Sequence, residues 1–310
     1  MLLQSYLRCR GVNVKEVCIL SGKGGAGKSS IVASMAVLLA DRAEIIVGDC
    51  DVDTPNLALI MGSSGDVECE TIRASEKAFL MAERCKSRKK CVRVCRFNAI
   101  KWSAKNSKPE INEFLCEGCG ACAYICPDRA IDIREVDTGK ICYFKSDYGF
   151  GVVSGHLKIG ERGSGKIVDS LRRKVSEIGR AEGLDLALLD SAAGIGCPVV
   201  SSVKGCDRAI IITEPTKAAI NDSKRAIELV RHFGIPHSII INKYDLNYEI
   251  AAEIEDLADR NEIPIMGRIP YDLAFTDALV NGLPAVICNP HLKKLFRGMV
   301  DELMLNMGLD

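Results

Sequence analysis

The hydrophobic pattern of the chain alternates between short apolar runs and longer amphipathic segments. Continuous apolar runs predict buried strands at residues 15–20, 44–49, 184–189, 208–213 and 238–242. Apolar residues spaced three or four apart predict helices at 30–40, 166–182, 216–232 and 248–260. Strands that alternate with helices indicate an α/β fold, in which helices cover both faces of a mostly parallel sheet.

A further amphipathic helix is predicted at the C-terminus. Asn289 and Pro290 form a start signal, because asparagine caps helices and proline fits the first turn. Seven apolar residues then share one face: Leu292, Leu295, Phe296, Met299, Val300, Leu303 and Met304. The polar face mixes both charge signs, which suits an anionic membrane poorly. We expect this helix to pack on the sheet.

Composition excludes several classes of function. The 310 residues include 41 basic and 41 acidic side chains, so the overall field does not favour nucleic acid. Aromatic residues make up 5%, too few for a platform that stacks bases. The chain has no apolar run of membrane-spanning length, and its first ten residues are too polar for a signal peptide. We expect a cytoplasmic protein that binds neither nucleic acid nor membrane.

The pattern of strands and helices is interrupted between residues 68 and 137. Eight of the fifteen cysteines lie there, seven of them between Cys85 and Cys126, together with basic residues and short breaks. We interpret 68–137 as a domain inserted into an α/β domain formed by 1–67 and 138–310. A reducing cytosol keeps thiols free, so we expect metal ligation rather than disulfides.

A phosphate-binding loop follows the first predicted strand. Residues 22–29 fit G-x-x-x-x-G-K-[ST] and lead into a predicted helix. Glycines allow the backbone N–H groups to approach phosphate oxygens closely. Lys28 would neutralise the β- and γ-phosphates, and Ser29 would ligate Mg²⁺.

Lys23 adds a second lysine at the front of this loop. The run Lys23-Gly-Gly-Ala-Gly-Lys28-Ser resembles the deviant Walker A loop of the MinD/Mrp/nitrogenase iron protein class of P-loop ATPases. The resemblance implies a three-layer, Rossmann-like P-loop NTPase fold and a homodimer that sandwiches ATP. It also implies that Lys23 reaches the partner's nucleotide; a solvated loop lysine is the alternative.

The resemblance extends to three carboxylates. Residues 49–57 resemble the class's first switch, in which Asp51 positions the attacking water and Asp49 lies in the outer shell of magnesium. Residues 188–194 resemble the second switch, with Asp190 as a further magnesium carboxylate. The catalytic residues implied are Lys23, Lys28 and Asp51, and magnesium is assigned to Ser29, Asp49 and Asp190.

Asn242 is the remaining residue assigned to the nucleotide. The run Asn242-Lys243-Tyr-Asp245 is also compatible with a guanine-reading motif, but in the MinD-like class the asparagine contacts adenine, so we expect ATP. The complete nucleotide-binding set is Gly22, Lys23, Gly24, Gly25, Ala26, Gly27, Lys28, Ser29, Ser30 and Asn242.

The inserted segment contains the cysteine run of bacterial ferredoxins. Cys116, Cys119, Cys122 and Cys126 form C-x₂-C-x₂-C-x₃-C-P, which favours a [4Fe–4S] cluster over zinc. Upstream, residues 85–100 repeat the pattern with Arg88 in place of its second cysteine. The insertion therefore resembles a small α+β ferredoxin with two cluster sites.

Ferredoxin halves exchange their fourth ligand. One predicted site then has a complete set, Cys95, Cys116, Cys119 and Cys122, for a [4Fe–4S] cluster. The other has Cys85, Cys91 and Cys126, and Arg88 cannot ligate iron because it stays protonated. A [3Fe–4S] cluster, a [4Fe–4S] cluster with an open iron and an empty site all remain open there.

The other cysteines and the basic residues give weaker signals. Cys197 follows Asp190 at the offset of a cluster-ligating cysteine in the nitrogenase iron protein, but a second such cysteine is not evident, so a core residue and a functional thiol both remain open. We interpret the others as core or surface thiols: Cys9, Cys18, Cys50, Cys69, Cys142, Cys206 and Cys288. The basic segment 84–96 suits either an acidic redox partner or the negative charge of clusters.

These observations favour one function and leave two others open. The chain resembles MinD superfamily ATPases with an inserted ferredoxin domain, which implies that ATP-driven closure of a homodimer is coupled to electron transfer with an unknown redox partner. The alternatives are ATP-dependent assembly or delivery of a metallocluster to a client protein, and a MinD-like positioning ATPase with structural clusters.

Overall fold

A computed structural model describes residues 14–309 of the protein. The chain divides into two compact units, each described by itself below. The first, which we call the α/β unit, comprises the chain up to Glu70, Ile141–His156 and the chain from Ser164. The second, the cysteine unit, comprises Thr71–Lys140 and Leu157–Gly163. The insertion predicted from the sequence spans 68–137 and does not include Leu157–Gly163.

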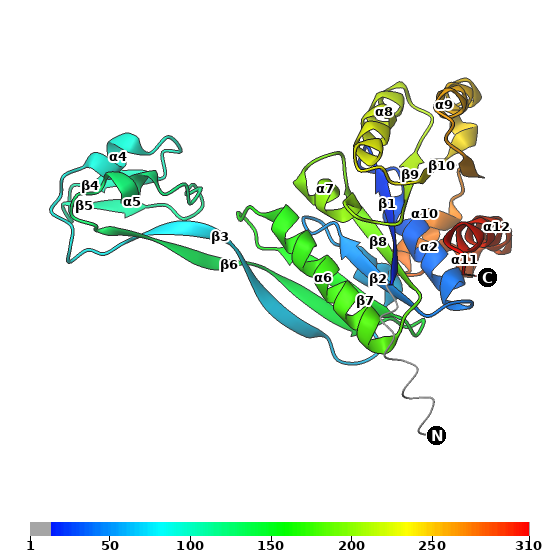
Figure 1. The fold of residues 1–310 in the computed structure, drawn as a ribbon, viewed down its shortest axis with the longest axis horizontal. Coiled ribbons are helices and arrows are strands. Elements are labelled where there is room, and N and C mark those ends of the chain that lie inside the picture. Colours follow the sequence, from blue (N-terminus) through cyan, green and yellow to red (C-terminus); the bar gives the residue numbers. More distant parts are fainter. Residues whose placement is uncertain (1–13, 310) are drawn as a thin grey trace. The chain divides into compact units, whose positions relative to one another are not determined.

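One sheet organises the α/β unit (Figure 1). Within residues 14–309 its strand order is β11-β10-β9-β1-β8-β2-β7-β6-β3. The bounds are β1 Lys15–Ser21, β2 Ile45–Cys50, β3 Glu68–Leu80, β6 Ile131–Lys145, β7 Gly151–Leu157, β8 Leu186–Ala193, β9 Arg208–Thr213, β10 His237–Asn242 and β11 Ile265–Ile269. β1 pairs in parallel with β8 and β9, and parallel pairing continues through β2, β7, β10 and β11.

All five predicted strands are present, and they are buried because helices cover both faces of the sheet. The helices are α2 Lys28–Ala40, α3 Leu57–Met61, α6 Ser164–Glu182, α7 Cys197–Val203, α8 Lys217–His232, α9 Tyr248–Arg260, α10 Ala274–Val280, α11 Ala285–Cys288 and α12 Pro290–Met307. Val47 packs in the core that contains α2 and α12. Its neighbour Gly48 faces Leu171 and Val175 of α6, since successive strand residues point to opposite faces. The α/β fold with a mostly parallel sheet is confirmed.

The C-terminal helix packs as predicted. The Asn289 side chain accepts hydrogen bonds from the backbone N–H groups of His291 (2.9 Å) and Leu292 (3.2 Å), which caps α12. Phe296 is completely buried in the core shared with α2. The apolar face of α12 is therefore covered within the α/β unit.

The cysteine unit is built from two similar halves. The first contains α4 (Lys90–Val94) and β4 (Ile100–Ser103), and the second contains α5 (Ala121–Ile125). β4 pairs in antiparallel fashion with β5 (Lys108–Ile111). A small core joins the halves: Ala78, Cys91, Ile100, Cys122 and Ile131.

The backbone repeats between the two halves. Left-handed residues occur at matching positions, in the pairs Ser87/Gly118, Lys89/Gly120 and Asn98/Arg129. Both helices end at a cysteine with extended backbone, Cys95 after α4 and Cys126 after α5. The internal repeat seen in the sequence thus has a counterpart in the backbone, and Arg88 occupies the position that Cys119 has in the other half.

Two cysteines differ from their prediction. Cys69 and Cys142 form a disulfide, whereas we expected free thiols. They are 73 residues apart in the chain, but β3 and β6 are neighbouring strands and bring their Cα atoms within 4.1 Å. Sequence spacing alone gives no sign of that proximity. Cys18, Cys50 and Cys206 are buried and Cys288 is exposed, as core and surface thiols; Cys9 lies outside the described residues.

Among the residues that the structure describes, no helix combines the length and the apolar character needed to cross a membrane.

Candidate functional site

The phosphate loop connects β1 to α2 at the carboxyl edge of the sheet. Gly25 and Gly27 have φ angles of +81° and +86°, a region that glycine adopts at little cost. A Cβ on Gly27 would lie 2.4 Å from Nδ2 of Asn242, so this position has no room for a side chain. Gly25 and its neighbour Gly24 are exposed, which leaves the outer side of the loop open to a ligand.

Lys28 lies at the start of α2 and is almost fully buried. Its Nζ is 3.5 Å from Oδ1 of Asp190, a fully buried residue of β8. Neither carboxylate oxygen of Asp190 has a hydrogen-bond partner among the described residues. Lys28 supplies one positive charge to this buried carboxylate, and its open acceptor sites are oxygens of the kind that Mg²⁺ with its coordinated waters would use. Ser29 and Ser30 follow in the first turn of α2 and are half-buried.

Asp49 lies beside Asp190, because β2 and β8 pair these two residues in register. Burial, and then the charge of Asp190, raise the pKa of Asp49 well above its ordinary value. Burial also raises the pKa of Asp190, although Lys28 opposes the shift. Two adjacent buried acids favour a bound cation, since a cation stabilises both charged forms.

The segment after β2 is held by Asp49 and Asp51. Asp49 accepts hydrogen bonds from the backbone N–H groups of Leu57 (3.1 Å) and Asp51 (3.3 Å). Asp51 is half-buried and accepts a hydrogen bond from the Thr54 hydroxyl at 3.2 Å. Asp51 thus keeps part of its surface open, as a residue that contacts water must. Its role in catalysis stays a prediction.

Lys23 forms an ion pair that the sequence analysis missed. Its Nζ lies 2.8 Å from Oε1 of Glu214, and the Nζ of Lys243 lies 3.4 Å from Oε2 of the same residue. Burial alone would raise the pKa of Glu214, but the Lys23 hydrogen bond and the two lysine charges hold it below its ordinary value. The signal available in the sequence was a carboxylate directly after the buried strand β9.

Asn242 lies beneath the phosphate loop. Its Nδ2 donates to the carbonyl of Ala26 at 2.8 Å, and its Oδ1 accepts from the backbone N–H of Lys243 at 3.0 Å. The side chain is buried. In this structure it supports the loop, while its predicted contact with adenine stays a prediction.

The predicted complete cysteine set lines one pocket of the cysteine unit. Cys95 from the first half and three cysteines from the second half, Cys116, Cys119 and Cys122, line a small pocket. We call it the four-cysteine pocket. Its remaining wall includes apolar residues such as Ile100 and Ile133. A low-polarity wall and four sulfurs match the donor chemistry of an iron–sulfur cluster.

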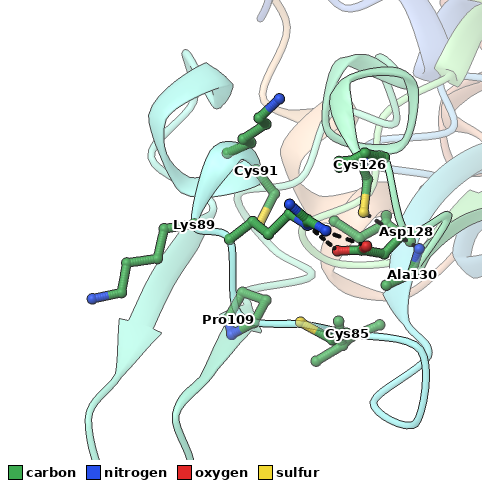
Figure 2. A pocket seen from close by; sticks show the side chains of 12 residues that line it. Cys85, Lys89, Cys91, Pro109, Cys126, Asp128 and Ala130 are labelled. Carbon is green, nitrogen blue, oxygen red and sulfur yellow. Dashed lines mark hydrogen bonds and ion pairs between the residues drawn. The ribbon is translucent and has the colours of Figure 1, made fainter.

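The other three cysteines line a second small pocket (Figure 2). Cys85 and Cys91 come from the first half and Cys126 from the second, and we call this the three-cysteine pocket. Its charged lining residues are Arg88, Lys89, Lys90 and Asp128. Arg88 Nε lies 3.2 and 3.0 Å from the two carboxylate oxygens of Asp128. Both pockets therefore draw cysteines from both halves, in the crossed pattern that the sequence predicted.

Backbone amides point at one sulfur in each pocket. The N–H of Ala78 donates to Sγ of Cys116, and that of Ala130 donates to Sγ of Cys126, both at 3.4 Å. Such bonds stabilise negative charge on sulfur and tune a cluster's reduction potential. Burial raises the pKa of Cys122 to about 11, so this thiol needs a nearby positive charge to ionise at neutral pH.

Cys197 is not a core residue. It is the first residue of α7, directly after the second switch segment, and it is exposed. The interpretation as a small buried residue is therefore wrong, because the start of a short helix at the sheet edge leaves the side chain in solvent. The basic residues of segment 84–96 are also exposed: Arg84, Lys86, Arg88, Lys89, Lys90, Arg93 and Arg96.

A parallel sheet, a glycine loop running into a buried lysine, and two strand-end acids define the class of P-loop nucleoside triphosphatases. The model of the CobQ/CobB/MinD/ParA nucleotide binding domain matches residues 17–285. The chain belongs to this family, and it is an ATPase of the MinD/ParA type.

Individual relatives are similar over most of the chain. An uncharacterised protein of Methanocaldococcus jannaschii is 38% identical over 76% of this chain and 80% of its own length. The iron-sulfur cluster carrier protein of Pyrococcus abyssi is 22% identical over 88% of this chain and 79% of its own. The MinD of Pyrococcus horikoshii, solved with Mg-ADP, shares the fold with a TM-score of 0.57, 19% identity and coverage of 94% and 96%.

Proposed function

We propose that the protein uses ATP binding and hydrolysis in a homodimer to control electron transfer through iron–sulfur clusters in the cysteine unit. The observation that carries the proposal is the pair of cysteine-lined pockets in a chain that also has an ATPase site. The donor partner is a redox protein of unknown identity.

The ATPase chemistry is assigned to residues on three elements. The loop's N–H groups and Lys28 stabilise the transferring phosphoryl group, and Ser29 with Asp190 and Asp49 holds Mg²⁺ and its waters. Asp51 orients the attacking water. Lys23 reaches the nucleotide of the partner subunit once it leaves Glu214.

The cluster assignment rests on the donor sets of the two pockets. A single zinc ion needs donors about 2.0–2.3 Å from one point, and the described residues contain no group of three or more such side chains arranged for one ion. In a cluster each thiolate binds a different iron, so the cysteines stand further apart. We assign a [4Fe–4S] cluster to Cys95, Cys116, Cys119 and Cys122.

Anaerobic voltammetry of the purified protein tests the coupling. We expect the reduction potential of the cluster to shift when a non-hydrolysable ATP analogue is bound, and a coupling free energy of about 1.4 kcal/mol corresponds to about 59 mV for one electron. The Lys28→Ala variant, whose phosphate loop lacks its lysine, is the matched control. The reduction potential of its cluster should not shift when the analogue is added. A colourless protein, or identical potentials with and without the analogue, would contradict the proposal.

A second candidate is delivery of a cluster to a client protein. Relatives that carry the name iron-sulfur cluster carrier protein favour it, and the exposed thiols Cys119 and Cys197 supply accessible sulfur. ATP-dependent transfer of iron to an apo-protein would support delivery, whereas reversible reduction with retained iron supports electron transfer. The remaining candidate, a positioning ATPase, predicts ATP-dependent co-sedimentation with membranes.

Releasing Lys23 should strengthen the dimer. Glu214 holds Lys23 within its own chain, so Glu214→Gln frees the lysine to reach a partner's nucleotide. Because an exposed ion pair contributes little, we expect the dissociation constant of the ATP-bound dimer to fall about two- to fivefold, as measured by analytical ultracentrifugation. Glu249→Gln removes the charge of an exposed side chain in the first turn of α9 and should leave the dissociation constant unchanged. Weaker dimerisation of Glu214→Gln would argue against a role for Lys23 in the dimer.

A further inference from the structure

The three-cysteine pocket has a fourth polar group in the place of its missing thiolate. Arg88 stands at the repeat position of Cys119, and its guanidinium donates hydrogen bonds to Asp128. Asp128 follows Cys126 and Pro127 directly and belongs to the same pocket lining. A carboxylate and three cysteine side chains therefore line one pocket, with a cation bound to the carboxylate.

The two members of this ion pair differ in exposure. The Asp128 side chain is 9% exposed, whereas that of Arg88 is 53% exposed. Asp128 needs a counter-cation, since an unpaired carboxylate at this depth is costly. Arg88 can turn into solvent without such a cost. The ion pair can therefore separate by movement of Arg88 alone, while the carboxylate of Asp128 stays in the pocket.

We infer that the three-cysteine pocket holds a three-iron cluster on Cys85, Cys91 and Cys126, and that its fourth corner is an exchangeable Fe²⁺ site with Asp128 as its protein ligand. Arg88 is the cation that occupies Asp128 when this iron is absent. The inference rests on the proposed function, because it requires that the cysteine unit binds clusters. Carboxylate is a suitable donor for Fe²⁺, and guanidinium and Fe²⁺ compete for the same oxygens.

The exchange balances in charge and electrons. A [3Fe–4S]⁺ cluster first takes one electron from a low-potential donor and becomes [3Fe–4S]⁰. This cluster then combines with Fe²⁺ to give [4Fe–4S]²⁺, and no further electron is transferred. Asp128 loses the hydrogen bonds from Arg88 and gains a bond to iron, while Arg88 keeps its proton and turns into water. Loss of Fe²⁺ reverses these changes.

Iron titration of the full-length, anaerobically purified protein tests this site. The probe is ferrous iron in the presence of dithionite, followed by iron counting and electron paramagnetic resonance. We expect the oxidised wild type to contain about seven irons per chain, with the signal of a three-iron cluster. Dithionite alone removes that signal by reducing the cluster, so uptake is measured as about one more bound iron per chain after free iron has been removed.

Variants of Arg88 and Asp128 test the two residues separately, Arg88 as the competing cation and Asp128 as the iron ligand. Arg88→Ala should take up the fourth iron at a ferrous concentration lower by about tenfold, because a charged hydrogen-bonded competitor is gone. Asp128→Asn should keep the three-iron signal but take up no further iron, and Asp128→Glu should restore uptake. Arg93→Gln removes a charge from α4 outside the pocket lining and should behave as wild type.

The signal of the cluster in the four-cysteine pocket serves as the internal control for folding. If that signal is present but the three-iron signal is absent, or if Arg88→Ala and Asp128→Asn titrate like the wild type, the inference is wrong while the proposed function stands. If no cluster is found in either pocket, the proposed function fails and the inference fails with it.

Discussion

Replacement of Lys28 by alanine is expected to reduce ATP turnover by about 100-fold or more. Lys28 is the buried cation at the phosphate loop, and its Nζ lies 3.5 Å from Asp190. Without it, no buried positive charge remains in the loop to stabilise the transferring phosphoryl group. The rate of phosphate release under saturating Mg-ATP measures the effect.

The same substitution should lower stability in the absence of nucleotide. It leaves the buried Asp190 without its ion-pair partner, which typically costs about 3–5 kcal/mol. The double variant Lys28→Ala/Asp190→Asn removes the orphaned charge and should recover part of that stability without recovering turnover. If Lys28→Ala turns over ATP as fast as the wild type, the assignment of the ATPase site to this loop is wrong.

Replacement of Cys95 by serine is expected to remove the cluster whose other three ligands come from the second half of the cysteine unit. The four-cysteine pocket joins Cys95 to Cys116, Cys119 and Cys122, so Cys95→Ser and Cys119→Ser should lose the same spectroscopic signal. Each should lose about four irons per chain. Cys85→Ser should keep this signal, because Cys85 lines the other pocket.

Cys288→Ser is the matched control for thiol loss, since Cys288 is an exposed thiol of the α/β unit. It should keep the iron content and both signals. The crossed assignment is wrong if Cys95→Ser and Cys85→Ser lose one signal together while Cys119→Ser loses another. That result would mean that each half holds its own cluster.

Local patterns predicted the central strands and the longer helices well. The apolar runs that became β1, β8 and β9 are buried on both faces, so nearly every residue in them carries the signal. β3 was missed because most of its residues are exposed or half-buried, and β6 was missed because exposed and half-buried residues separate its buried ones over most of its length. A strand of this kind is specified by its neighbours in the sheet, which a local pattern does not contain.

The residues of the candidate site also fall into two groups, those that the sequence identified and those that it missed. Glycine loops and cysteine runs depend on close spacing along the chain, so Lys28 and Cys116 could be selected from the sequence. Glu214 and Asp128 were missed because each acts on a residue distant in sequence, Lys23 or Arg88. Cys69 and Cys142 were misassigned for the same reason.

The sequence by itself determined the family-defining loop, the alternation of strands and helices, and the two sets of cysteines, because these features are encoded within a few residues of each other. Only the tertiary structure decided which charges meet. It paired Lys23 with Glu214, Lys28 with Asp190 and Arg88 with Asp128. Ion pairs act through distance in space, and the packing of the whole sheet or of both repeat halves is what sets that distance.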